Sequence, residues 1–492
     1  MRMPAITSLL CAIALTAAGT IASLTCAPPA SAWTHGFVPT TCAYGSAYAD
    51  GCAAAPLNGS FLQASFPSYA RQSSQTWLAD HPQPWNVAGV DYRVGYDTTL
   101  SLIDATVSPP PNCLYQPTGG AGGKPWVECN IGGAVEVING YDFTKGGTTC
   151  VGLDIIGNGT SLTISNSKFK RVGSTCDGMY LIKINSPGPY PLTFTQNEIN
   201  GNYPTYVDGT LDYEVADNRT SGSATYAYNA FINVAARPIV GLFDGGVTFQ
   251  YNYWGGIGIN STGTHVEPVG AYVDAGITVP NEDYKFNTVV ITSGVTTHTI
   301  TAMAFLNQSG STPSTITTSS ILNNTYVNNY SGGFGGTYSN SASIFTANIP
   351  LITTLTVQNN YSDPTGSLYC AYYGPATGNI TATISNGSGG AGNILTVSAI
   401  ASGTIEPGAT IFGTSIAGSP VIAAYGTSGT TGVGGTGTYI VSGATQNISG
   451  TTWQTTPAVG TLNFSGNINL TDGSTITVAG PILNTGTCNG HA

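Results

Sequence analysis

Apolar and polar residues alternate over much of this chain, and one eight-residue pattern of alternation returns nine times between Glu136 and Asn469. Its first and third positions are mostly apolar or aromatic, as in Leu162 and Ile164, and its eighth is usually large and apolar. Alternation with a period of two predicts a β-strand that turns one row of side chains into a core. The copies read EVINGYDF, LTISNSKF, LTFTQNEI, ATYAYNAF, VTFQYNYW, EDYKFNTV, SSILNNTY, LTVQNNYS and LNFSGNIN.

The sixth position of this pattern is asparagine in seven of the nine copies. Asparagine tolerates the left-handed backbone of a tight turn, and its amide can bond to an asparagine stacked above it. The copies begin 26, 30, 32, 23, 35, 37, 36 and 107 residues apart, a spacing typical of stacked supersecondary units. A β-sandwich would predict no column of one polar residue type. We therefore expect a solenoid whose successive turns stack these asparagines: Asn197, Asn229, Asn252, Asn287, Asn324, Asn360 and Asn467.

This coil pattern resembles the right-handed parallel β-helix superfamily, which includes pectate lyases, polygalacturonases and phage tailspikes. The resemblance covers about two thirds of the chain and rests on the coil pattern, without an active-site motif. It implies an all-β fold with about 4.8 Å of rise per coil. Eight coils are expected between Val127 and about Tyr373, which would form a rod on the order of 40 Å long.

The segments before and after this solenoid are predicted to be a leader, a cap and a C-terminal tail. Residues 1–32 resemble a secretory signal peptide, with an apolar run from Ile6 to Leu24 and a small-residue cleavage site. Residues 33–90 are predicted to be an N-terminal cap, in which a short amphipathic helix within Ser65–Asp80 covers the open end of the core. The β-helix is expected over 91–379, and 456–492 would hold the final coil and a tail.

Residues 380–455 change character and account for the long gap before the last copy of the pattern. They lack the asparagine pattern and are rich in Gly-Thr and Ser-Gly turns. They resemble a small Gly/Thr-rich β module found in bacterial surface and phage-tail-like proteins. We expect an inserted module whose role is spacing or weak surface contact.

Composition narrows the possible partners. Only 7% of the residues are charged, and the formal net charge is −11. An acidic chain with so few basic residues is a poor nucleic-acid binder, and it would repel a polyanion unless a cation such as Ca²⁺ bridged the two. After the leader, no run of 18 apolar residues predicts a membrane span. We expect a secreted, cell-surface or periplasmic protein.

Eight cysteines follow the predicted leader, and their even number in an exported chain favours disulfides. No Cys/His spacing suggests a zinc site. Sequence alone does not fix the connectivity, and pairing of neighbours is one hypothesis; the 26 residues between Cys150 and Cys176 equal one coil. The hypothesised pairs are Cys42 with Cys52, Cys113 with Cys129, Cys150 with Cys176, and Cys370 with Cys488.

The resemblance also implies where chemistry would occur. In related lyases and hydrolases the active site lies on the outer face of the strand that precedes the asparagine pattern. Here those strands are expected at Met179–Ile184, Thr210–Val215, Pro238–Phe243, His265–Val269 and Thr299–Leu306. Alternation would bring Lys183, Asp212, Glu214, Arg237, His265 and Glu267 to one outer face, with Asp217 and Arg219 in flanking loops. Alternatively, these charges form only an ordinary ladder of surface pairs.

Two catalytic schemes would use this group. In a polyuronate lyase, Asp208, Asp212 and Glu214 would hold Ca²⁺ against the substrate while Arg237 or Lys183 removed a proton. In a glycoside hydrolase, Asp212 and Glu267 would be the acid and base. The sequence lacks the Asp-Asp, Gly-His-Gly and Arg-Ile-Lys motifs of polygalacturonases and the Arg-x-Pro-x-x-Arg spacing of pectate lyases.

Two hypotheses about function follow. The first is an exported β-helix protein that binds an extracellular polysaccharide on this face, with cleavage as a further step. The second is a non-catalytic surface or adhesive scaffold.

Overall fold

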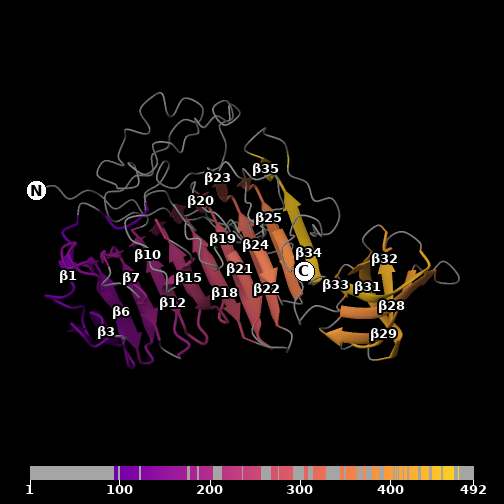
Figure 1. Ribbon diagram of the computed structural model, residues 1–492, viewed down its shortest axis with the longest axis horizontal. Coiled ribbons are helices and arrows are strands. Elements are labelled where there is room, and N and C mark those ends of the chain that lie inside the picture. Colours follow the sequence, from indigo (N-terminus) through magenta and orange to yellow (C-terminus); the bar gives the residue numbers. More distant parts are fainter. Residues whose placement is uncertain are drawn as a thin grey trace, which may run out of the picture. The chain divides into compact units, whose positions relative to one another are not determined.

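The computed structural model describes residues 94–475 with gaps, the longest at 203–212, 256–267, 292–303 and 329–343. All described residues belong to one compact unit, Pro39–Ala492. Every regular element in this part of the chain is a β-strand (Figure 1), so the predicted all-β class is confirmed. The predicted leader and the cap segment 33–90 lie outside the described residues.

Three long sheets, here named I, II and III, contain most of the strands. Sheet I is built from the strands of the repeated pattern. Its strands are β4 (Val135–Asn139), β7 (Ser161–Ser165), β10 (Leu192–Thr195), β13 (Ala224–Ala227), β16 (Val247–Gln250), β19 (Thr278–Lys285), β22 (Thr315–Leu322), β25 (Leu351–Gln358) and β34 (Ala458–Ser465).

Sheet II receives the strand that follows each asparagine turn. Its strands are β1 (Ile103–Asp104), β5 (Tyr141–Asp142), β8 (Lys168–Lys170), β11 (Glu198–Asn200), β14 (Ala230–Ile232), β17 (Tyr253–Gly255), β20 (Thr288–Ile291), β23 (Thr325–Asn328), β26 (Tyr361–Ser362) and β35 (Ile468–Asn469).

Sheet III holds the strand that precedes the next copy of the pattern. Its strands are β2 (Cys113–Gln116), β3 (Trp126–Asn130), β6 (Gly152–Ile156), β9 (Ile182–Ile184), β12 (Tyr213–Asp217), β15 (Arg237–Leu242), β18 (Val269–Val273), β21 (Ala304–Gln308), β24 (Ile344–Ala347) and β27 (Tyr369–Tyr372). From β4 to β27 the chain visits sheets I, II and III in turn, and each visit adds a strand parallel to the previous strand of that sheet. This order is compatible with the predicted parallel β-helix.

The register of the sheets stacks equivalent positions of the pattern directly over one another. Leu192 pairs with Leu162 on one side and with Ala224 on the other, and all three side chains are buried. In the next core row, the rings of Tyr226 and Phe249 stack with centroids 4.9 Å apart. The core is therefore a set of parallel rows of like side chains.

The expected column of asparagine amides is confirmed. Each of the seven side chains is fully buried. Asn252, for example, donates from Nδ2 to the Tyr226 carbonyl at 2.8 Å and to Asn287 Oδ1 at 3.1 Å. Its own Oδ1 accepts from the backbone N and the Nδ2 of Asn229, each at 2.9 Å. The amides thus link one coil to the next through both backbone and side chain.

The left-handed residue of each turn is not the asparagine, as the sequence suggested, but the residue before it. Gln196, Tyr228, Tyr251 and Phe286 all have φ of 56°. The asparagine follows with its side chain turned inward, where it donates to the carbonyl of the next-to-last residue of the sheet I strand in the preceding coil. One residue makes the bend, and the next satisfies the backbone groups that the bend exposes.

A fourth sheet, sheet IV, is antiparallel and lies within the residues predicted to form an inserted module. It has its own core, which includes Ile384, Leu395, Tyr439 and Trp453. The sheet I strands that come before and after it in the chain, β25 and β34, pair directly with each other, with Leu355 opposite Leu462. The strand order of sheet IV is β30 (Ile411–Phe412), β33 (Ile448–Thr455), β28 (Asn379–Asn386), β29 (Asn393–Ser402), β32 (Gly437–Ser442) and β31 (Val421–Gly429).

One predicted disulfide is confirmed. Cys113 and Cys129 face each other in the antiparallel β2–β3 hairpin and are bonded. Cys150 is also disulfide-bonded, while its hypothesised partner Cys176 lies outside the described residues. Cys370 lies in β27, and its side chain is not among those described. Its hypothesised partner Cys488 lies outside the described residues, as do Cys42 and Cys52.

Within the part of the chain that the structure describes, no helix is long and apolar enough to cross a membrane.

Candidate functional site

The strands predicted to carry the site all belong to sheet III, and Lys183 lies on its outer face. The flanking Ile182 and Ile184 are fully buried, whereas Lys183 is half-buried, because alternate residues of a strand point to opposite faces. Lys183 pairs with Asp154 on one side and with Ala216 on the other. The outer row that contains it reads Glu128, Asp154, Lys183, Ala216, Val240 and Gly270.

Asp154 is a site residue that sequence reasoning missed. Burial raises its pKa, the charge of Lys183 opposes that rise, and the charge of Glu128 adds to it. One carboxylate oxygen, Oδ1, is buried and has no hydrogen-bond partner among the described residues. The available signal was the triplet Leu153-Asp154-Ile155, an apolar–charged–apolar pattern like the one centred on Lys183.

Glu214 is not an exposed acid, although the sequence predicted it on the outer face. It is only 3% exposed, and Arg171 Nε donates to both of its carboxylate oxygens at 2.8 Å. Arg171, also 3% exposed, follows β8 of sheet II and donates from Nη2 to the Met179 carbonyl at 3.0 Å. The carboxylate is therefore neutralised inside the protein, which counts against a role as catalytic base or calcium ligand.

Arg237 is the first residue of β15, whereas the sequence predicted it just before a strand that begins at Pro238. Its side chain is 7% exposed and donates from Nη1 to the Tyr272 hydroxyl at 3.1 Å. A Cβ on Gly270 would lie 3.4 Å from Arg237 Cδ and 3.5 Å from Nη1. The guanidinium therefore passes directly over this glycine, the residue of the outer row that lacks a side chain.

Lys183 and Arg237 are two strands apart in sheet III, which corresponds to about 10 Å along the stack. In the outer row, Lys183 is followed by Ala216 and then by Val240, which are small or medium-sized and apolar. The face thus offers two cations and the Tyr272 ring beside a low apolar strip.

The other predicted site residues cannot be placed. Asp208, Asp212, His265 and Glu267 lie outside the described residues, and the strand predicted to begin at His265 is described only from Val269. Among the described residues, no group of three or more His, Cys, Asp or Glu side chains could hold a metal ion. The calcium site stays a prediction.

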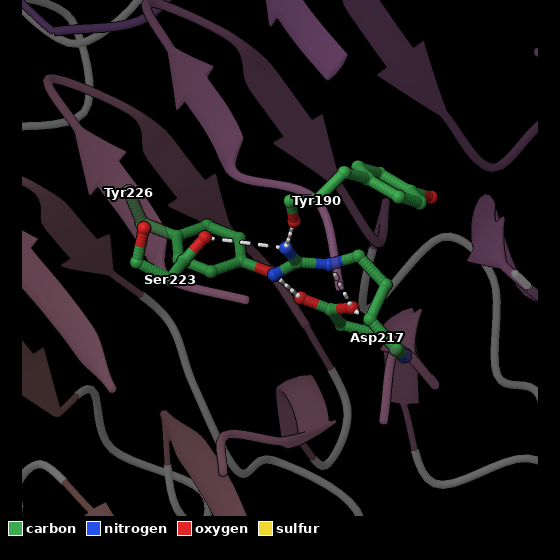
Figure 2. Close-up of polar contacts among 5 residues, drawn as sticks. Tyr190, Asp217, Ser223 and Tyr226 are labelled. Carbon is green, nitrogen blue, oxygen red and sulfur yellow. Dashed lines mark hydrogen bonds and ion pairs between the residues drawn. The ribbon is translucent and has the colours of Figure 1, made fainter. Parts of the chain in front are cut away.

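The inner side of β12 carries a second buried ion pair, shown in Figure 2. Asp217 and Arg219, predicted in loops, are 0% and 1% exposed, and two hydrogen bonds of 2.8 Å join them. Arg219 Nη1 donates to the carbonyls of Tyr190 at 2.6 Å and Ser223 at 3.2 Å, and the Tyr226 hydroxyl donates to Asp217 Oδ2 at 3.0 Å. Burial, followed by the charge of Asp217, raises the pKa of Tyr226 well above its ordinary value. The cluster is closed and holds neighbouring coils together.

Comparison with known proteins found no match to this chain among family models, curated proteins or solved structures.

Proposed function

We propose that this chain is an exported right-handed parallel β-helix protein, similar to pectate lyases in fold, that binds an extracellular polysaccharide on the outer face of sheet III. The observation that carries the proposal is the position of Arg237 and Tyr272 over Gly270, on the same face as Lys183. A guanidinium and an ammonium suit carboxylate or hydroxyl groups of a glycan, and a tyrosine ring suits the apolar face of a sugar.

The regular spacing of the strands supports a polymer as ligand. Parallel strands repeat every 4.7–4.9 Å, so the face offers side chains at regular steps along the stack. An extended chain of sugars can contact several such steps at once. Because the acidic protein would otherwise repel a polyanion, the carboxylates of such a glycan would meet Lys183 and Arg237 or be bridged by a cation such as Ca²⁺.

Cleavage is the finer part of the proposal. A lyase or hydrolase mechanism would use Asp212, His265 and Glu267, because Glu214 is held by Arg171. A non-catalytic scaffold is the second candidate function. What favours it is that both described acids of β12, Glu214 and Asp217, are in buried ion pairs.

Binding to pectate, alginate and a neutral glucan, each with and without Ca²⁺, tests the proposal. We expect Lys183→Ala and Tyr272→Phe to weaken binding of the acidic glycans, and Lys145→Ala, at an exposed lysine outside sheet III, to leave it unchanged. Urea unfolding of each variant separates lost binding from lost folding. Wild-type affinity in both face variants would overturn the proposed site, and an unsaturated uronate product would identify a lyase.

A further inference from the structure

The middle of the outer face of sheet II, from β11 to β23, is buried, although it points away from the solenoid core. Its outer row contains Glu198, Ala230, Tyr253, Thr288 and Thr325, which are neighbours in register and between 0% and 4% exposed. The residues that alternate with them, such as Phe231 and Trp254, lie in the solenoid core. Sheet II therefore has two buried faces and needs a layer on its outer side.

A short segment that leads into the solenoid, Val94–Asp97, lies against this face. Gly95 donates its backbone N–H to the Tyr228 carbonyl at 2.9 Å, and Val94 is 2% exposed. Burial, followed by the charges of Glu198 and Asp142 of sheet II, raises the pKa of Tyr96 to about 12.

The direction of this segment shows where its first residue lies. Tyr228 belongs to the fourth copy of the repeated pattern, whereas Ile103 in β1 donates its N–H to the carbonyl of Gly140 in the first copy. Between Val94 and Ile103 the chain thus descends three coils, roughly 14 Å. Val94 therefore lies beside the middle of sheet II.

We propose that residues 39–93 of this chain cover the outer face of sheet II, and thus occupy a side of the solenoid and not its open end. The segment has 55 residues, of which five are Asp, Glu, Lys or Arg, and it contains Phe66, Trp77 and Trp85. An apolar cover suits the face, since its outer row includes Ala230 and the ring of Tyr253. With sheet II covered in this way, a glycan would meet sheet III instead.

Photo-crosslinking in the full-length protein tests the cover directly. Benzoylphenylalanine in place of Tyr253 puts the probe on the buried outer face, and the same residue in place of Tyr425, 36% exposed in sheet IV, is the control. We expect position 253 to crosslink to residues 39–93 of the same chain and position 425 not to. Crosslinks from 253 to another segment, to a second copy of the chain, or to nothing would overturn the proposal.

A second measurement uses limited trypsin digestion. Ala230→Glu places a second carboxylate beside Glu198 under the proposed cover, whereas Thr193→Glu places one on an exposed strand position of sheet I. Because a buried unpaired charge is costly, we expect Ala230→Glu to speed cleavage at Arg71 and Arg93 by at least about tenfold, with Thr193→Glu unchanged. Equal cleavage rates in the two variants would contradict the cover, and the crosslink is the deciding measurement if Ala230→Glu does not fold.

Discussion

Arg219 holds Asp217 through two parallel hydrogen bonds, Nε to Oδ1 and Nη2 to Oδ2, each 2.8 Å long, although the two residues are separated by only one position. Arg219 also donates to the carbonyls of Tyr190 and Ser223, which lie two residues before β10 and one residue before β13, two strands that pair with each other. The arginine therefore ties the entry points of two neighbouring coils to the end of β12.

Replacement of this arginine tests how much the cluster stabilises the fold. Arg219→Met would leave Asp217 buried and unpaired, so we expect the free energy of unfolding to fall by about 3–5 kcal/mol. The double variant Arg219→Met/Asp217→Asn should lose less than the sum of the two single variants, because it leaves no buried charge. Urea unfolding measures both quantities. A loss below about 1 kcal/mol in Arg219→Met would show that the cluster has no such role.

The asparagine column predicts a second large effect on stability. Asn252→Ala removes the amide that accepts from the backbone N–H and the Nδ2 of Asn229 and that donates to the Tyr226 carbonyl and to Asn287 Oδ1. Asn287 Oδ1 keeps its bond from the Asn252 backbone N–H, whereas the backbone N–H of Asn229 loses the acceptor that this amide supplies. Each buried group left unpaired costs about 1–3 kcal/mol, so we expect a clear fall in the denaturation midpoint. Asn218→Ala, at an exposed asparagine, is the matched control and should change stability by less than about 0.5 kcal/mol. Equal midpoints for the two variants would contradict a structural role for the column.

The same column shows how much of the fold could be predicted from sequence. Stacked asparagines repeat at one position of a local pattern, so their alignment follows from the pattern alone. The left-handed residue was misplaced, because three coils use Tyr228, Tyr251 and Phe286 there, residues that rarely adopt positive φ. Their rings stack at 4.8 and 4.9 Å, which offsets the backbone strain between coils. Gly140 and Gly466 occupy the same fifth position in two other copies of the pattern, and these glycines were the indication in the sequence that the position has positive φ.

The candidate site was less predictable, because its chemistry depends on contacts between distant segments. Alternation placed Lys183 on the outer face and its neighbours Ile182 and Ile184 inside. The partner of Glu214, however, is 43 residues away and comes from the end of a sheet II strand. No local pattern relates Arg171 to Glu214, so the neutralisation of this acid became apparent only in the folded chain.

That ion pair gives a prediction that separates stability from binding. Glu214→Gln leaves the Arg171 guanidinium buried without its counter-charge, so we expect unfolding at lower urea concentration, with a loss of about 3 kcal/mol. We expect the folded variant to bind the acidic glycan with unchanged affinity, because the carboxylate does not face the ligand. Calorimetric titration together with urea unfolding checks both outcomes. Loss of binding in a fully folded Glu214→Gln protein would return this residue to the site.

Glu282 predicts how stability depends on pH. It lies in the inner row of sheet I between Val247 and Ser319, fully buried, and neither carboxylate oxygen has a hydrogen-bond partner among the described residues. Burial, followed by the charge of Asp283, raises its pKa from 4.5 to about 8. The folded protein therefore binds this proton more tightly than the unfolded chain does.

The sign of the effect follows from that difference. The contribution of Glu282 to stability is complete below the unfolded pKa of 4.5 and is lost as the pH rises towards the folded pKa of about 8. Glu282→Gln mimics the neutral acid, so we expect it to match the wild type near pH 4 and to be several kcal/mol more stable near pH 9. Urea midpoints across this range give the difference. Asp283→Asn removes the smaller of the two causes of the raised pKa, so this variant should keep most of the wild-type dependence of stability on pH. If the stability of Glu282→Gln instead ran parallel to that of the wild type across this pH range, the Glu282 carboxyl would already be ionised in the folded protein.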